Sequence, residues 1–123
     1  MKYRKTKSEK IQESINKWEV VKREISNCHQ RLSYVKHYWK ECGYCHTCGY
    51  KCKNCLLNDT IQYDDFLYYY CDSFSQSIAI KTLNYADEKE WNTAMMFICM
   101  LLKKMYKDLE WVKEGENNVQ EYI

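Results

Sequence analysis

Apolar residues recur every three or four positions along the first forty residues, and they predict a long amphipathic helix. Neither glycine nor proline interrupts residues 1–42. The apolar positions fall on one face of a 3.6-residue helix: Ile11, Ile15, Trp18, Val21, Ile25, Cys28, Leu32, Val35 and Trp39. Thr6 followed by Glu9 has the form of a capping box, so the helix is expected to begin near Lys7 and to run to about Lys40.

A second apolar stripe, from Trp91 to Val112, predicts another long helix over residues 87–114. Asp87 and Glu90 resemble another capping pair at its start, and Gly115 is expected to end it. The polar tail is then expected to fray. Because each long helix has one apolar face, we expect the two to pack against each other in antiparallel directions.

The segment between the cysteine-rich run and the second helix, residues 60–83, fits two interpretations. Helical spacing is kept by Leu67, Tyr70, Phe74 and Ile78. Short strands are suggested by Tyr68-Tyr69-Tyr70 and Ile78-Ala79-Ile80, because aromatic and β-branched residues favour strands. The helical interpretation is favoured, with Asp64-Asp65 as its N-cap.

These patterns predict an all-α single domain, residues 1–123. Two long antiparallel helices, 7–40 and 87–114, are joined through a cysteine-rich metal-binding loop, 41–57, and a shorter helical segment, 60–83, and the tail occupies 115–123. A hydrophobic content of 46% in 123 residues suffices for one modest core.

The longest apolar run, Ala94 to Leu102, is far shorter than the roughly 20 residues that span a bilayer. The N-terminus, Met-Lys-Tyr-Arg-Lys-Thr-Lys, lacks the apolar stretch of a secretory signal. The sequence therefore predicts a soluble protein of the cytoplasm, with no membrane partner.

Five cysteines lie within fourteen residues, in the run C-G-Y-C-H-T-C-G-Y-K-C-K-N-C at 42–55. Two thiolates separated by two residues can bind one metal ion from a single tight turn, and in a reducing cytoplasm such cysteines are more often ligands than disulfides. A tetrahedral zinc ion needs four ligands. The most economical set is Cys42 with Cys45 and Cys52 with Cys55.

Other cysteines leave the ligand set open. Cys48 is either spare or replaces one of the four, and the Gly49 that follows it favours a role at the metal. His46 could also ligate, although a histidine there is more often a loop residue. Cys71 is the first choice for a distant ligand. Cys28 and Cys99 lie on apolar helix faces and are expected to be buried thiols.

An iron–sulfur cluster is the alternative cofactor. Cys42, Cys45, Cys48 and Cys52 reproduce the C-x2-C-x2-C-x3-C spacing of bacterial ferredoxins. However, Lys53 stands where those proteins have proline, and the intervening residues are bulky and polar rather than small. Zinc is therefore preferred over a 4Fe-4S cluster.

The Ser14-Ile15-Asn16-Lys17-Trp18-Glu19 helix, the paired C-x2-C motifs and a lone Cys71 ahead of Phe74 resemble a family of small phage and prophage proteins of unassigned activity. The resemblance spans roughly residues 11–110. It departs at Leu56, where a proline commonly follows the last pair, and in the additional Cys48. The resemblance implies an origin in a mobile element, where small proteins often bind and disable a host factor, as anti-CRISPR proteins do.

Catalytic motifs are not recognisable. His29, His37 and His46 have no serine or acidic partner at a motif spacing, and three glycines cannot build a phosphate-binding loop. Four or five clustered thiolates would close the coordination sphere and leave no position for water. The sequence therefore favours a protein that is not an enzyme.

Charge is divided unevenly along the chain. Residues 1–55 carry 13 basic and 5 acidic side chains, whereas residues 56–123 carry 6 and 12. A basic half that binds nucleic acid is one interpretation, and two helices of opposite sign that satisfy each other is another.

Twelve tyrosines exceed what one small core can bury, and tyrosine is favoured at protein interfaces. We therefore expect binding and inhibition of a host protein or ribonucleoprotein, with a small nucleic-acid-binding regulator as the alternative. The sequence does not tell whether Trp18 and Trp39 face a core or a partner. The predicted contact residues are Tyr44, Tyr50, Lys51, Lys53, Lys36 and Lys40.

Overall fold

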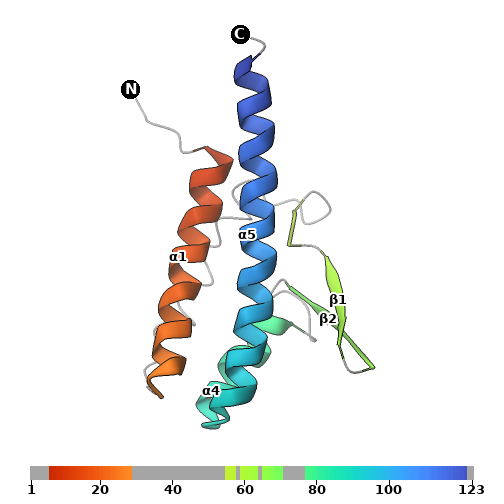
Figure 1. Cartoon of the computed structure of the whole chain (residues 1–123). Helices are drawn as coiled ribbons and strands as arrows, with labels where there is room; N and C mark the ends of the chain where they lie inside the picture. Colours follow the sequence, from red (N-terminus) through yellow and green to blue (C-terminus); the bar gives the residue numbers. More distant parts are fainter. Residues whose placement is uncertain (1–5, 29–54, 58, 64, 71–76, 122–123) are drawn as a thin grey trace.

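The computed structural model describes residues 6–28, 55–57, 59–63, 65–70 and 77–121. These residues form three helices and one β-hairpin, and the longest helix runs through the middle of the molecule (Figure 1). The prediction of a helical protein is confirmed in outline. The hairpin is the main departure from it.

Helix α1 spans Lys7–Ser26 and begins as the sequence predicts. The Thr6 side chain accepts a hydrogen bond from the backbone N–H of Glu9 at 3.2 Å, which satisfies one of the amides left unpaired at a helix start. Thr6 Oγ1 also donates to Glu9 Oε1 at 3.2 Å, so Glu9 contacts the cap through the Thr6 hydroxyl. The apolar stripe of α1 is buried as expected, and Trp18 belongs to this core.

The end of α1 differs from the sequence prediction. The helix stops at Ser26, Asn27 is its C-cap, and Cys28 has a φ of 56°. A residue in this left-handed region cannot continue a right-handed helix, so one continuous helix to Lys40 is wrong. The side chains of Ser26 and Asn27 can bond to nearby backbone groups and so compete with the helix. The sequence prediction missed this end because the apolar spacing continues beyond it. Residues 29–40 lie outside the described part of the chain.

Strands β1, Thr60–Tyr63, and β2, Phe66–Tyr69, form an antiparallel hairpin. The prediction of a helix over this part of the chain is therefore wrong. Asp65 lies in the turn with a φ of 68°, a left-handed conformation that aspartate tolerates, so it does not serve as a helix N-cap. Aromatic and β-branched side chains on neighbouring strands outweighed the weaker helical spacing.

Helix α4, Ile78–Asp87, begins at Ser77, whose side chain accepts from the backbone N–H of Ile80 at 3.3 Å. The strand alternative for Ile78–Ile80 is thus excluded. Asp87 is the last residue of α4 rather than the first of the next helix, which corrects the predicted capping pair. Among the described residues of 60–83, the helical prediction holds from Ile78 onward and is wrong for the two strands.

A tight turn joins α4 to the next helix. The N–H of Lys89 bonds to the carbonyl of Ala86 at 3.0 Å, and the N–H of Glu90 bonds to the carbonyl of Tyr85 at 2.8 Å. This pair of bonds is a Schellman motif, in which the residue after the helix cap takes a left-handed conformation. Lys89 occupies that position with a φ of 62°, where glycine is usual.

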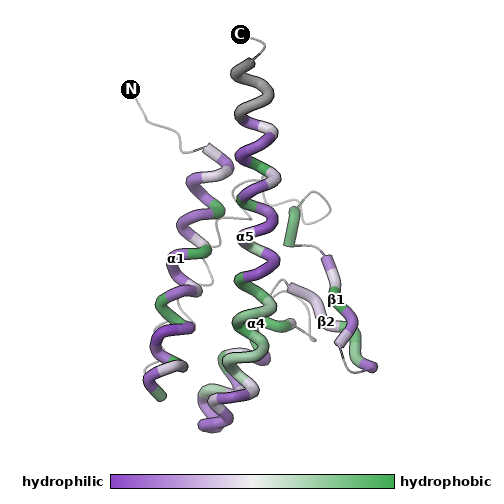
Figure 2. The backbone as a smooth tube through the Cα atoms, in the orientation of Figure 1, coloured by the Kyte–Doolittle hydropathy of each residue, from purple (hydrophilic) through white to green (hydrophobic). Residues whose placement is uncertain are grey.

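Helix α5 spans Trp91–Glu121 and is longer than predicted. It passes through Gly115, so the predicted stop there is wrong, while the predicted fraying of the tail from Glu116 stays a prediction. Figure 2 shows that the hydrophobic residues of α5 gather in the half that follows α4, whereas the C-terminal half is mostly hydrophilic. Among the described helices, none is long and apolar enough to cross a membrane.

The core lies where α1 and α4 pack against α5, with α1 and α5 antiparallel and side by side (Figure 1). Ile11, Ile15 and Val21 of α1 and Ile98, Leu101 and Met105 of α5 are all fully buried. The predicted antiparallel pairing of the two helices is therefore confirmed. Removing this much apolar surface from water is the main stabilising term in a domain of this size.

A polar contact joins the first turn of α1 to the C-terminal part of α5. The Glu116 carboxylate on α5 accepts from Ser8 Oγ at 2.8 Å and from the Ser8 backbone N–H at 3.2 Å. A carboxylate at a helix N-terminus satisfies an unpaired amide and interacts favourably with the helix dipole. This contact holds α5 against α1 immediately after Gly115.

Candidate functional site

The predicted metal site falls largely outside the described residues. Only one of its cysteines is described, and Cys55 is half-buried and packs against the core. Leu57, two residues later, is buried at 1% exposure, so the end of the cysteine run is anchored on the core. The residues outside the described part are Cys42, Cys45, Cys48, Cys52, Cys71 and His46. Within the described ranges, no group of three or more histidine, cysteine or acidic residues could hold a metal ion.

The two helical cysteines are not where the sequence predicted. Cys28 and Cys99 are both exposed, so the prediction of buried thiols is wrong for each. Cys28 lies beyond the end of α1, on the left-handed residue. Cys99 follows the buried Ile98 directly, and a step of one residue turns a side chain about 100° around a helix and away from the core.

The predicted partner contacts also fall outside the described residues. Their placement therefore stays a prediction: Tyr44, Tyr50, Lys51, Lys53, Lys36 and Lys40. The structure instead exposes a different set of aromatic and apolar side chains, on the hairpin and on the outer side of α5.

The hairpin is fixed to the core at its base and free at its tip. Tyr68 packs edge-on against Phe97 of α5 with ring centroids 5.3 Å apart, and Phe97 also stacks on Tyr85 of α4 at 5.6 Å. At the tip, Phe66 is 55% exposed and Leu67 is 51% exposed. In Figure 1 the hairpin extends away from the helices, in agreement with the exposure of these two side chains.

The edges of the hairpin are only partly open to another strand. The N–H of Thr60 bonds to the Asp59 carboxylate at 2.8 Å, and Tyr69 forms a bridge with Ser77 on the opposite edge. An edge strand binds a new strand through a row of unpaired backbone groups. With part of each row occupied, side chains are better suited than backbone to contact a partner.

A groove of about 670 Å³ lies between the base of the hairpin and the outer side of α5. Its described lining combines apolar, aromatic and charged side chains: Asp59, Ile61, Tyr70, Met100, Lys103, Lys104, Lys107, Asp108, Glu110, Trp111 and Glu114. Seven of these eleven residues are charged, so the groove suits a charged ligand better than an apolar one.

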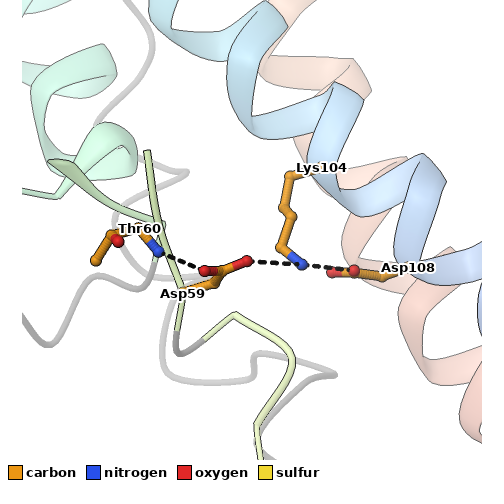
Figure 3. A network of polar contacts seen from close by, with 4 residues as sticks. All are labelled: Asp59, Thr60, Lys104 and Asp108. Carbon is orange, nitrogen blue, oxygen red and sulfur yellow. Dashed lines mark hydrogen bonds and ion pairs between the residues drawn. The ribbon is translucent and has the colours of Figure 1, made fainter. Parts of the chain in front are cut away.

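Figure 3 shows Lys104 between two carboxylates, Asp59 and Asp108, and these three side chains form the polar floor of the groove. Its Nζ lies 2.7 Å from Asp108 Oδ1 and 3.6 Å from Asp59 Oδ2, so it bridges α5 and the hairpin. The ammonium also lies 5.9 Å from the centre of the Tyr70 ring. Asp108 is buried at 5% exposure, and pairing with Lys104 offsets the cost of removing its charge from water.

Two tyrosines, Tyr70 and Tyr106, hold their protons more tightly than usual. Burial raises the pKa of Tyr70, and the nearby carboxylates of Asp59 and Asp108 raise it further. On the other side of α5, desolvation and a hydrogen bond to Glu19 raise the pKa of Tyr106, whose hydroxyl lies 3.0 Å from Glu19 Oε1. Both hydroxyls therefore keep their protons to higher pH than an ordinary tyrosine does.

The groove was not predicted from the sequence. Trp111 lies in the predicted second helix, but nothing in the pattern indicated that it stays 66% exposed. The pair Lys104 and Asp108, four residues apart, was readable as a helical ion pair. Asp59 joins them only because the hairpin brings it to α5, and the hairpin was itself missed.

Comparison with known proteins and structures identified no similar protein. No family model matches the sequence, no curated protein matches it, and no solved structure matches the fold.

Proposed function

We propose that this protein is a non-enzymatic binding protein that acts by attaching to a host protein or ribonucleoprotein and inhibiting it. The observation that supports this proposal best is the exposed hairpin tip. Phe66 and Leu67 remain more than half exposed, whereas the apolar side chains between the described helices are buried. Because successive side chains of a strand alternate, Phe66 and Leu67 expose apolar surface on both faces of the tip, where a partner can contact it. The phage-type family resemblance suggests a component of a defence system as the target.

A capture experiment tests this function. Tagged full-length protein is incubated with host lysate, with and without nuclease, and the retained protein is then purified and titrated directly against the chain. We expect one host protein to bind in both conditions. Replacing Phe66 and Leu67 with serine should abolish binding, because it removes the apolar contact area that anchors the complex.

Val20→Ser is the matched control. Val20 is 44% exposed on α1, so this variant removes a similar exposed apolar side chain at a distance from the hairpin. It should bind as the unchanged protein does. Equal loss in both variants, or undiminished binding by the hairpin variant, would contradict the proposal.

The alternative function is that of a nucleic-acid-binding regulator that uses the basic first half of the chain. Binding through phosphates weakens steeply with salt, because each neutralised phosphate releases a counterion. Capture that disappears after nuclease treatment, together with tight and salt-sensitive binding of the isolated protein to DNA or RNA, would favour this alternative.

A structural zinc ion in the cysteine run is the second part of the proposal. Metal binding contributes on the order of 10 kcal/mol of folding free energy in zinc-finger peptides. The helices α1, α4 and α5 pack directly on one another, so we expect chelation to lower the melting temperature while most helical signal in circular dichroism remains.

Cys52→Ser or Cys55→Ser should reproduce the effect of chelation. Cys99→Ser is the control, since this exposed thiol should cost little to replace. Elemental analysis of protein purified without added metal should find zinc. A brown protein that absorbs near 400 nm would indicate the iron–sulfur alternative, because thiolate-to-iron charge transfer falls roughly there. Absence of both metals would refute this part of the proposal.

A further inference from the structure

The groove between the hairpin and α5 has a floor with more negative than positive groups. Two carboxylates, Asp59 and Asp108, face a single ammonium, that of Lys104 (Figure 3). Asp108 takes the shorter contact, at 2.7 Å, and Asp59 lies farther away at 3.6 Å. The Asp59 side chain is 59% exposed, so its carboxylate remains accessible from the groove.

The same two carboxylates also influence the hydroxyl of Tyr70. Apart from burial, the causes that raise the pKa of its hydroxyl are the charges of Asp59 and Asp108. Asp59 and Asp108 therefore disfavour a further negative charge beside them, although the Lys104 ammonium lies over the same ring. A cation that enters the groove would be attracted at short range.

An exposed aromatic ring borders the same floor. Trp111 follows Lys104 by seven residues, or about two helical turns, so both lie on the same side of α5. The indole is 66% exposed, the highest value among the exposed large hydrophobic side chains of the described residues. Tryptophan is the aromatic side chain that cations prefer, and a guanidinium can also stack flat on it.

The rim does not favour an anion. Lys103 and Lys107 are exposed there, but Glu110 and Glu114 share the same rim and are exposed as well. A phosphate would meet two lysines and two carboxylates, with the third lysine of the groove already paired at the floor. Charge complementarity therefore points to a cationic ligand.

We propose that the groove between the hairpin base and α5 receives an arginine side chain of the partner protein, stacked on Trp111 and bound to the Asp59 carboxylate. This inference rests on the proposed binding function and names the chemistry of the partner. Arginine fits better than lysine because its planar fork matches a carboxylate while its flat face covers an aromatic ring. Ile61 belongs to β1, and Asp59 and Tyr70 lie next to the ends of the two strands. A partner that binds the hairpin tip therefore lies next to the groove.

The test is a titration of the full-length protein with acetyl-Gly-Arg-Gly-amide, followed by nuclear magnetic resonance. The indole N–H signal of Trp111 is identified by its loss in Trp111→Phe. We expect the arginine peptide to shift this signal with a dissociation constant on the order of millimolar, as suits a single side chain. The citrulline analogue, which has the same shape without the charge, should produce no shift.

Asp59→Asn should weaken the peptide about threefold to tenfold, the range expected for one partly exposed charge-assisted contact. Asparagine keeps an oxygen that can accept from the Thr60 N–H, so the hairpin should stay folded. Glu88→Gln is the control, because this exposed acid lies after α4 and does not line the groove. Its affinity should equal that of the unchanged protein.

Three results would overturn the inference: equal shifts with the citrulline or lysine peptide, undiminished affinity in Asp59→Asn, or a shift of the Trp111 signal by inorganic phosphate at the same concentration. Its failure is distinguishable from failure of the proposed function. Hairpin-dependent capture of a host protein, with no arginine binding, would refute only the proposed arginine site. Arginine binding in the groove of a protein that captures no host partner would refute only the proposed function.

Discussion

Glu116 should contribute measurably to stability although it lies on the hydrophilic end of α5. Its carboxylate makes two hydrogen bonds to Ser8, one to the hydroxyl at 2.8 Å and one to the backbone amide at 3.2 Å. A hydrogen bond to a charged group contributes about 1.5–3 kcal/mol, and partial exposure reduces that value. Ser8 Oγ keeps a second partner, Thr6 Oγ1 at 3.0 Å, so the hydroxyl is not left unpaired when the carboxylate is removed.

We therefore expect Glu116→Ala to lower the free energy of unfolding by about 1–2 kcal/mol. For a domain of this length that corresponds to a decrease in melting temperature of roughly 4–8 °C. Chemical denaturation followed by circular dichroism measures the change. Amide hydrogen exchange should also show earlier opening of α5 beyond Gly115, because the contact that holds this end against α1 is gone.

Glu114→Ala is the control, since it makes the same change of side chain on an exposed position of the same helix. It should cost no more than a few tenths of a kcal/mol. A double-mutant cycle with Ser8→Ala should give a coupling of at least about 0.5 kcal/mol. If Glu116→Ala and Glu114→Ala destabilise the protein equally, the contact does not stabilise it and the reasoning fails.

Other perturbations have expected outcomes that follow from the backbone and from titration. Lys89→Gly should raise the free energy of unfolding by about 0.5–1 kcal/mol in denaturant titrations, because glycine takes the left-handed conformation of that turn without strain, whereas a loss would show that the turn differs. Gly115→Ala should stabilise by about 1 kcal/mol, since a Cβ there meets nothing within 4 Å and alanine favours a helix; destabilisation would indicate a hidden contact. Stability should fall as pH rises above about 10, because the unfolded chain releases the Tyr70 proton before the folded protein does. Tyr70→Phe should reduce this alkaline loss, and an unchanged pH profile would contradict the assignment.

The sequence predicted those parts of the fold that depend on local periodicity. The start of α1 at Thr6 and the buried face of the second long helix follow from side chains close together in the chain, so the pattern sufficed. The end of α1 was missed because the apolar spacing continues past the break at Cys28. Gly115 led to a predicted helix end that does not exist, since a tertiary contact of Glu116 overrides the local stop signal.

The candidate site was harder to predict because it depends on contacts between distant segments. Residues 60–69 carry aromatic side chains at spacings that suit a helix and a strand equally, and pairing between β1 and β2 decided the outcome. Once that hairpin exists, Asp59 meets Lys104 across the groove. Neither residue has a motif around it, so the sequence alone gave no reason to connect them.

The turn at Lys89 sets the order in which the protein should fold. It joins α4 and α5 within three residues, so their contacts are local and can form early, whereas α1 must reach α5 across a connection of roughly fifty residues to α4. Closing such a loop costs about 1.4 kcal/mol more than closing one of ten residues. Mutations between α4 and α5 should therefore slow refolding, and mutations on the α1 face should mainly speed unfolding.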